Sequence, residues 1–232
     1  MSSGKSPDSK AATGWPLVSV VVAVYNGGRY LSSALDSVFA QDYRPLEVIL
    51  VDDGSTDDTV EVARSYPEVR ILCQSNQGVA AARNAGIAAA IGDFLAFVDA
   101  DDLWALNKLA AQVGHLLAHP EVDGTVGLVQ NFLNGTPPGA SVRGTADRTG
   151  LMTLVARRDV FRRVGIFAVA YRVGSDMEWF SRARDAGATI QVLPCLVLYR
   201  RIHGGNLSGQ ADARKASTLR IFRQSIERKR KQ

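Results

Sequence analysis

Apolar runs and amphipathic segments alternate along the chain up to about residue 100. Four apolar runs, mostly rich in β-branched residues, are typical of strands covered on both faces: 17–25 (LVSVVVAVY), 46–51 (LEVILV), 69–73 (VRILC) and 94–98 (FLAFV). The segments between them have helical character: 28–41, 55–66 and 78–92. Strands that alternate with helices over short connections predict an α/β fold, with a Rossmann-like, mostly parallel central sheet flanked by helices. Ser55 and Asp58 have capping-box spacing, so the second helix is expected to begin there.

The second half of the chain has a less regular pattern. Its expected elements are a helix at 106–120, a strand at 124–133, a Gly- and Pro-rich loop at 134–150, a strand running into a short helix at 151–165, a helix at 175–187 and a strand at 189–201. Pro194 is expected to break the last strand. Because no internal repeat is present, residues 16–208 are expected to form one domain. A disordered tail, 1–15, would precede it, and a basic helix or tail, 209–232, would follow.

Composition and charge are those of an ordinary globular protein. Of the 232 residues, 46% are hydrophobic and 22% are charged, and the net charge of +4 does not by itself indicate nucleic acid as a partner. No apolar run approaches the roughly 20 residues that cross a bilayer, and the N-terminal stretch lacks the apolar region of a secretion signal. Cys73 and Cys195 lack metal-site spacing, which favours a reduced, cytoplasmic protein.

Carboxylates follow two of the expected parallel strands. Asp52 and Asp53 end the second strand, and Asp99, Asp101 and Asp102 follow the fourth in FVDADDLW. Because ligands of open parallel sheets bind outside the carboxyl ends of the strands, both groups are expected at one crevice. Neighbouring negative charges repel one another, so this arrangement favours a cation site. Asp102 has a structural alternative, as the N-cap of a following helix.

Six motifs in order resemble the family 2 glycosyltransferases of the GT-A fold. They are VSVVVAVYNGGRYL, VDDGSTDDT, GVAAARNAGI, FVDADDLW, SDMEWFSRARDAG and YRRIHGGNLS, from about Pro16 to Ser208. Each motif is weak alone, whereas the ordered set is specific. The resemblance implies a single GT-A domain that moves a sugar from a nucleotide-diphosphate donor to an acceptor hydroxyl. It also implies inversion at the anomeric carbon, and UDP is the favoured nucleotide.

The resemblance implies a metal site formed by Asp99, Asp101 and His203. Carboxylate oxygens are hard ligands that suit Mn²⁺ or Mg²⁺ bridging a diphosphate, so one of these ions is the expected cofactor. The ion would neutralise charge on the departing nucleotide diphosphate. Asp101 is the better candidate for direct ligation, and His203 is expected to approach the metal or diphosphate when a glycine-hinged loop closes.

The same resemblance implies a nucleotide-sugar site beside the metal. Asp52 and Asp53 resemble the element that reads the base, because a carboxylate can accept the N3–H of uracil. Val24 and Tyr25 end the first strand motif, where an aromatic ring lines or stacks on the base. Arg83 is expected near the phosphates or bracing the aspartates. The structural alternatives are a core or rim tyrosine and a surface arginine.

Asp176 is the candidate catalytic base that takes the proton from the acceptor hydroxyl. Trp179 resembles a residue that packs near the acceptor pocket, and it is grouped with the nucleotide-sugar-binding residues. Glu178 is a weaker alternative base. Many relatives have an acidic residue where this chain has Ser175. This departure leaves open a non-catalytic nucleotide-sugar binding module, and Asp176 could also cap its helix. A sugar-1-phosphate nucleotidyltransferase is disfavoured, because VYNGGRYL lacks that class's longer, lysine-containing loop.

The C-terminal segment RKASTLRIFRQSIERKRKQ is basic and amphipathic. Leu219, Phe222 and Ile226 share one helical face, and Lys and Arg crowd the others. Two alternatives follow. The first is an interfacial helix on anionic lipid, which would give a cytoplasmic protein peripheral contact with the membrane. The second, which is favoured, is a helix docked on the core with a solvated basic end. The sequence does not distinguish among acceptors: a saccharide, a lipid-linked saccharide and a peptide are all compatible with these motifs.

Overall fold

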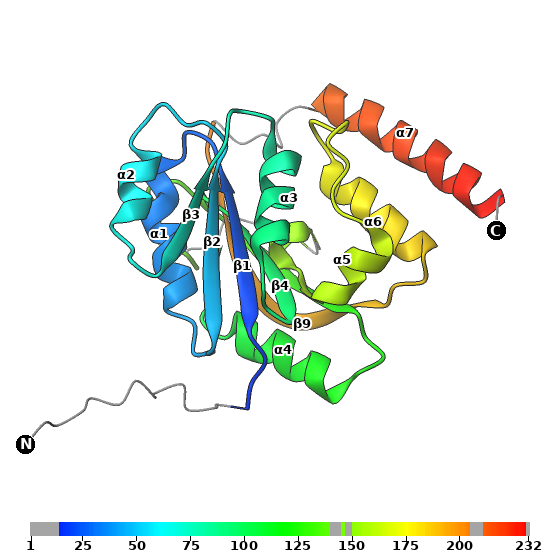
Figure 1. Ribbon diagram of the computed structural model, residues 1–232, viewed down its shortest axis with the longest axis horizontal. Helices are drawn as coiled ribbons and strands as arrows, with labels where there is room; N and C mark the ends of the chain where they lie inside the picture. Colours follow the sequence, from blue (N-terminus) through cyan, green and yellow to red (C-terminus); the bar gives the residue numbers. More distant parts are fainter. Residues whose placement is uncertain (1–13, 140–144, 147–149, 205–210, 231–232) are drawn as a thin grey trace, which may run out of the picture.

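Helices cover both faces of a central sheet (Figure 1). The computed structural model describes residues 14–139, 145–146, 150–204 and 211–230. The strands are β1 Val18–Val24, β2 Leu46–Asp52, β3 Val69–Cys73, β4 Phe94–Asp99, β5 Leu103–Trp104, β6 Gly124–Leu133, β7 Thr145–Ala146, β8 Val155–Arg157 and β9 Ile190–Ile202. The helices are α1 Gly28–Phe39, α2 Thr59–Arg64, α3 Val79–Ala89, α4 Lys108–Ala118, the 3₁₀ turn η1 Leu151–Thr153, α5 Arg158–Val164, α6 Ser175–Asp185 and α7 Ala211–Arg230.

The described strands form one sheet in the order β3-β2-β1-β4-β8-β6-β9-β5, with β7 paired to β6. The four N-terminal strands β1 to β4 are parallel, and β6 and β9 form a second long parallel pair. Short antiparallel pairings through β8 join the two parts. Because the long pairings are parallel, the expected α/β sheet is confirmed, and the second half of the chain extends it rather than forming a separate unit.

The strand β1 is buried on both faces, as its continuous apolar run predicts. Val20 and Val22 face a core covered by α1, α2 and α4, whereas Val21 faces a core covered by α3, α5 and α6. The helix α3 packs against this strand through small residues, among them Gly86. A Cβ atom at Gly86 would lie 2.4 Å from Cγ1 of Val21, so only glycine fits there without movement.

Helix α2 begins later than the capping-box spacing predicts. It starts at Thr59, and the side chain of Ser55 instead accepts a hydrogen bond from the backbone N–H of Asn26 at 2.8 Å. The carboxylate of Asp57 accepts from the N–H groups of Thr59 and Gly28, each at 3.1 Å. The predicted start at Ser55 is therefore wrong, because contacts with the β1–α1 loop determine the shape of this segment.

Two further expectations about elements are wrong. Pro194 does not break β9, because the strand continues to Ile202 and irregular register with β6 between Val126 and Val129 absorbs the disturbance. Asp102 does not cap a helix, since the short strand β5 follows it and α4 begins only at Lys108.

The chain ends lie partly beyond the described residues. Of the expected N-terminal tail, 1–15, residues 1–13 lie outside the described residues. The end of the expected domain, residues 205–208, lies outside them as well. Helix α7 packs against α6, so the C-terminal segment docks on the domain. Among the described helices, none is both long and apolar enough to cross a membrane.

Candidate active site

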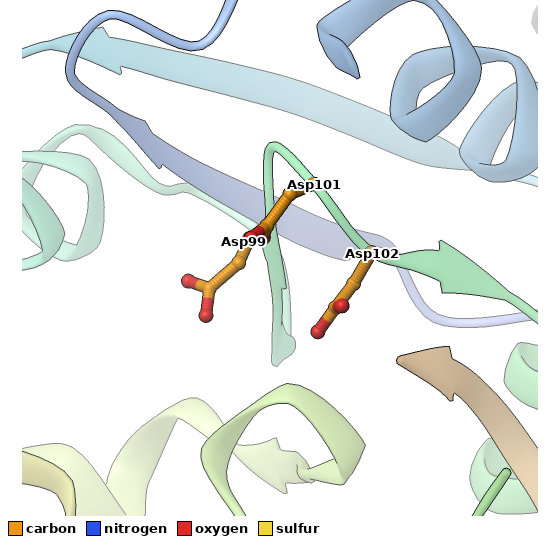
Figure 2. Close-up of side chains that lie close together, drawn as sticks. All are labelled: Asp99, Asp101 and Asp102. Carbon is orange, nitrogen blue, oxygen red and sulfur yellow. The ribbon is translucent and has the colours of Figure 1, made fainter. Parts of the chain in front are cut away.

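The turn between β4 and β5 brings three carboxylates together (Figure 2). Asp99 ends β4, and Asp101 and Asp102 follow in a turn that the Asp102 N–H closes on the Asp99 carbonyl at 3.1 Å. One carboxylate oxygen from each residue lies within 4.8 Å of the other two. Asp99 and Asp101 are partly exposed, whereas Asp102 is buried. Hard oxygen donors this close together fit a divalent cation such as Mg²⁺ or Mn²⁺.

The electrostatics of the turn favour a positive ligand. Burial raises the pKa of the Asp99 carboxyl, the negative charges of Asp101 and Asp176 add to this rise, and Arg83 opposes it. Burial, followed by the charges of Asp101 and Asp99, raises the pKa of Asp102 well above its usual range. A bound cation would relieve this mutual repulsion, which is the behaviour expected of a metal-binding turn.

Arg83, in α3, forms an ion pair with one carboxylate of the cluster. Its Nη2 lies 2.9 Å from Oδ1 of Asp99, and the residue is largely buried. The alternative of a surface arginine is therefore wrong. Arg83 pairs with only one of the three carboxylates, so the cluster keeps negative charge that can bind a cation.

His203 approaches the turn from the end of β9. Its Nε2 lies 2.9 Å from Oδ2 of Asp101, and its ring lies against Tyr30 with centroids 5.0 Å apart. The sequence-based metal ligands lie close together: Asp99 and Asp101 share the turn, and His203 joins them from a segment 102 residues away from Asp101. The third carboxylate of the cluster, Asp102, was not among the predicted ligands.

Arg201 stabilises the turn through two hydrogen bonds, a contact that the sequence did not predict. Its backbone N–H donates to Oδ1 of Asp102 and its Nε donates to the carbonyl of Asp101, both at 3.0 Å. The guanidinium lies between the rings of Tyr30 and Phe132, at 4.9 and 4.6 Å from their centroids. The only signal for this residue in the sequence is its place in the motif YRRIHGGNLS, where a second arginine, Arg200, precedes it.

Asp52 and Asp53 lie at the same edge of the sheet as the turn. Their strand β2 flanks β1 on one side and β4 flanks it on the other, with Val24 opposite Asp52 and Ala23 opposite Asp99. The expected convergence of the two acidic strand ends on one edge is therefore confirmed.

The contacts of Asp52 and Asp53 differ from those of the turn. Both are buried, and Asp53 accepts hydrogen bonds from the N–H groups of Gln77 and Gly78 at 2.8 Å, at the beginning of α3. Asp52 accepts from the N–H of Ser55 at 3.2 Å. These carboxylates shape the loops at the edge and do not belong to the carboxylate cluster.

Tyr25 is 52% exposed at the carboxyl end of β1. The alternative of a core tyrosine is wrong, and the ring is accessible to a planar ligand. Its neighbour Val24 is buried, and its carbonyl accepts the N–H of Asp53 at 2.8 Å. Val24 thus anchors the loop that begins at Asp53, and its expected contact with the nucleotide sugar stays a prediction.

The N-terminus of α6 carries Asp176 close enough to affect the pKa of Asp99. Gly174, with φ +86°, makes the left-handed turn that starts the helix. Asp176 is partly exposed, and its negative charge raises the pKa of Asp99, which indicates that the candidate base lies near the carboxylate cluster. Glu178, the alternative base, is buried and paired with Arg182 at 2.8 Å, which gives it a structural role.

Trp179 is a core residue. Its side chain is fully buried, stacks on Phe161 with centroids 4.5 Å apart, and donates from Nε1 to the carbonyl of Gly165 at 2.8 Å. The side chain therefore has no exposed surface to offer a donor or acceptor, and its expected place in the nucleotide-sugar site stays a prediction. An aromatic residue on an amphipathic helix cannot be assigned to core or pocket without its neighbours.

Residues 19–173 match the profile of Glycosyl transferase family 2, which is more than half of the chain. The chain belongs to this family. The glucosyltransferase WfaP of Escherichia coli, named UDP-Glc:alpha-D-GlcNAc-diphosphoundecaprenol beta-1,3-glucosyltransferase, is 37% identical over 100 residues, 42% of this chain and 40% of WfaP. Glycosyltransferase GlyG of Streptococcus pneumoniae serotype 4 is 45% identical over 98 residues, 40% of this chain and 33% of GlyG. The family 2 chain thus spans less than half the length of these relatives.

Solved structures confirm the GT-A type of fold for this family 2 chain. S. aureus TarS 1-349 in complex with UDP-GlcNAc has a TM-score of 0.71 and 22% identity, covering 83% of this chain and 60% of TarS 1-349. Mannosyltransferase PcManGT from Pyrobaculum calidifontis, in complex with GDP-Man and Mn²⁺, has a TM-score of 0.70 and 23% identity, covering 93% of this chain and 65% of that enzyme.

Proposed function

We propose that the protein is an inverting, metal-dependent glycosyltransferase that uses a nucleotide-diphosphate sugar, with UDP as the favoured nucleotide. The observation that carries the proposal is the carboxylate cluster Asp99–Asp102 at the carboxyl end of β4, with Asp176 facing the same region. Family membership supports the reaction class, and the complexes of TarS and PcManGT support a nucleotide-sugar donor.

Asp99, Asp101 and His203 would hold Mn²⁺ or Mg²⁺ at this edge. The ion, when bound, supplies Lewis-acid neutralisation of the diphosphate. Arg83 keeps Asp99 oriented, and Arg201 fixes the backbone of the turn through the Asp101 carbonyl. The exposed ring of Tyr25 is available to stack on the base, and the loops held by Asp52 and Asp53 border the same edge.

Asp176 acts as the general base. It takes the proton of the acceptor hydroxyl while the acceptor oxygen forms a bond to the anomeric carbon. The bond from that carbon to the nucleotide diphosphate breaks in the same step, and the electron pair leaves with the diphosphate. Attack from the face opposite the leaving group inverts the anomeric centre.

We propose a saccharide as the acceptor, carried on a lipid diphosphate. The similarity to WfaP supports this class, because WfaP is named for an acceptor sugar linked to diphosphoundecaprenol.

Replacement of the base tests the catalytic role directly. Asp176→Asn should lower kcat by about 10²- to 10⁴-fold, the usual contribution of a general base, and leave donor affinity unchanged. Asp159→Asn is the matched control, because Asp159 is also an acid in the first turn of a helix. Turnover that survives in Asp176→Asn would refute this assignment. Absence of turnover in the wild-type protein with every nucleotide sugar would favour a non-catalytic binding module.

A further inference from the structure

Helix α7 is fixed to the domain by one of its faces. Ile221 and Ser225 on this face are buried. The hydroxyl of Ser217 donates to the carbonyl of Val173 at 2.8 Å, and Nε of Arg228 donates to Asp185 at 2.9 Å. These contacts hold α7 against α6 and against the loop that precedes it, so the orientation of the helix on the domain is defined.

A second face of α7 is apolar and exposed. Leu219, Phe222 and Ile226 are 63%, 60% and 53% exposed, and their spacing places them along one side of the helix. At about 100° per residue, this side points away from the face that carries Ile221 and Ser225. We call these three residues the outer stripe. Three large apolar side chains on one helix face are unfavourable in water unless another surface covers them.

Basic residues border the outer stripe. At 100° per residue, the exposed cations beside the stripe are Arg223, Lys229 and Arg230, whereas Arg220 lies over the ring of Tyr171 in the domain. An apolar stripe with a basic border is the pattern of helices that lie in the plane of an anionic lipid surface. The apolar side chains enter the acyl boundary, and the basic side chains reach the headgroup phosphates.

We propose that the outer stripe of α7 docks the protein on the surface of an anionic lipid bilayer. Charge argues against a second copy of the chain as the occupant. A two-fold symmetric contact through this face would bring two groups of net positive charge together, which costs binding energy. An anionic bilayer matches both the apolar stripe and its basic border.

Docking through α7 would also position the active site. The hydrogen bond between Ser217 and Val173 joins α7 to the loop that leads into α6, three residues before Asp176. In Figure 1, α7 lies along the upper right of the molecule and β1 points toward the top of the view. A bilayer against α7 would therefore lie close to the site, where a lipid-carried acceptor is presented. Only this consequence rests on the proposed function.

Vesicle binding without donor or acceptor tests the docking independently of turnover. The full chain is sedimented with vesicles of phosphatidylcholine alone and with vesicles of phosphatidylcholine and phosphatidylglycerol. Binding is expected to the mixed vesicles and to weaken with salt. Combined replacement of Leu219, Phe222 and Ile226 by Ser should weaken it at least about tenfold, because the apolar contact is lost.

The matched control replaces three apolar residues that are equally exposed elsewhere: Ile91, Leu106 and Val192. Their combined replacement by Ser should leave vesicle binding unchanged. Arg223→Glu should weaken binding to the mixed vesicles because it reverses a charge in the basic border. The proposal is overturned if the wild-type chain does not bind the mixed vesicles or if the outer-stripe variant binds them normally. Self-association in solution that the same variant abolishes would also overturn it, in favour of a second copy.

Discussion

Lys108 shows how one residue in α4 makes the stability of the fold depend on pH. Its side chain is fully buried, with Nζ 2.8 Å from Oε1 of Gln112, 3.0 Å from the carbonyl of Thr153 and over the ring of Trp104. Burial lowers the pKa of Lys108 from 10.5 to about 7. The protonated form is therefore the costly one in the folded protein.

Stability should rise with pH because of this lysine. Above about pH 7 the folded side chain releases its proton, whereas an unfolded lysine keeps it up to about pH 10.4, so the unfolded state binds more protons. The free energy of unfolding of wild type relative to Lys108→Met should increase by up to about 1.4 kcal/mol per pH unit in this window. Urea denaturation of both proteins at several pH values measures the difference, and a pH-independent difference would contradict the assignment.

Single residues were predictable where their chemistry is unusual for their position. Asp99 and Asp101 stand directly after a buried strand, so their charge alone pointed to a ligand site. Trp179 and Glu178 carry no such mark, because an aromatic or acidic residue on an amphipathic helix fits a core, a pocket or a surface. Only their contacts, with Phe161 for Trp179 and with Arg182 for Glu178, show that both are structural.

At the scale of elements, the end of β9 determines the geometry of the turn after β4. Arg201 donates to the Asp101 carbonyl through Nε and lies between the rings of Tyr30 and Phe132. A lysine could keep the charge but offers neither the planar stack nor the Nε donor. Arg201 is therefore a positioning residue, which acts on a ligand through the turn.

Arg201→Lys should weaken Mn²⁺ binding by about 10- to 100-fold, the usual effect of losing a residue that orients metal ligands. Calorimetric titration of the protein with Mn²⁺ measures this change, and circular dichroism at the same temperature verifies that the variant is folded. Arg70→Lys is the control, because this arginine lies in β3 and binds the carbonyl of Ala89. An unchanged Mn²⁺ affinity in Arg201→Lys would show that the turn keeps its geometry without this contact.

Elements were predictable where a local pattern determines them. β1, β2 and β4 follow from continuous apolar runs, since each is buried on both faces. The start of α2 was not predictable, because a contact of Asp57 with Gly28 determines it. The continuity of β9 was not predictable either, because pairing with β6 continues past Pro194. In both cases the deciding partner is distant in the sequence.

At the scale of the whole molecule, the site exists because the second half of the chain completes the first. The Rossmann-like half supplies Asp99 and Asp101, while β9 brings His203 and α6 brings Asp176 to the same edge. The sequence predicted this grouping through family resemblance rather than through physical pattern. The side on which α6 and β9 pack depends on pairings such as β8 with β4, which involve few residues and leave no periodic signal.

Donor binding with and without metal tests whether the carboxylate cluster holds a metal ion for the nucleotide sugar. The affinities of a panel of UDP- and GDP-sugars are measured by calorimetry for wild type, Asp101→Asn and the control Asp42→Asn, which changes an exposed acid. We expect Mn²⁺ to increase donor affinity at least about tenfold in wild type and in the control, and Asp101→Asn to lose this gain. A gain that persists in Asp101→Asn, or that is absent from wild type for every sugar, would show that the cluster does not hold a metal ion for the donor.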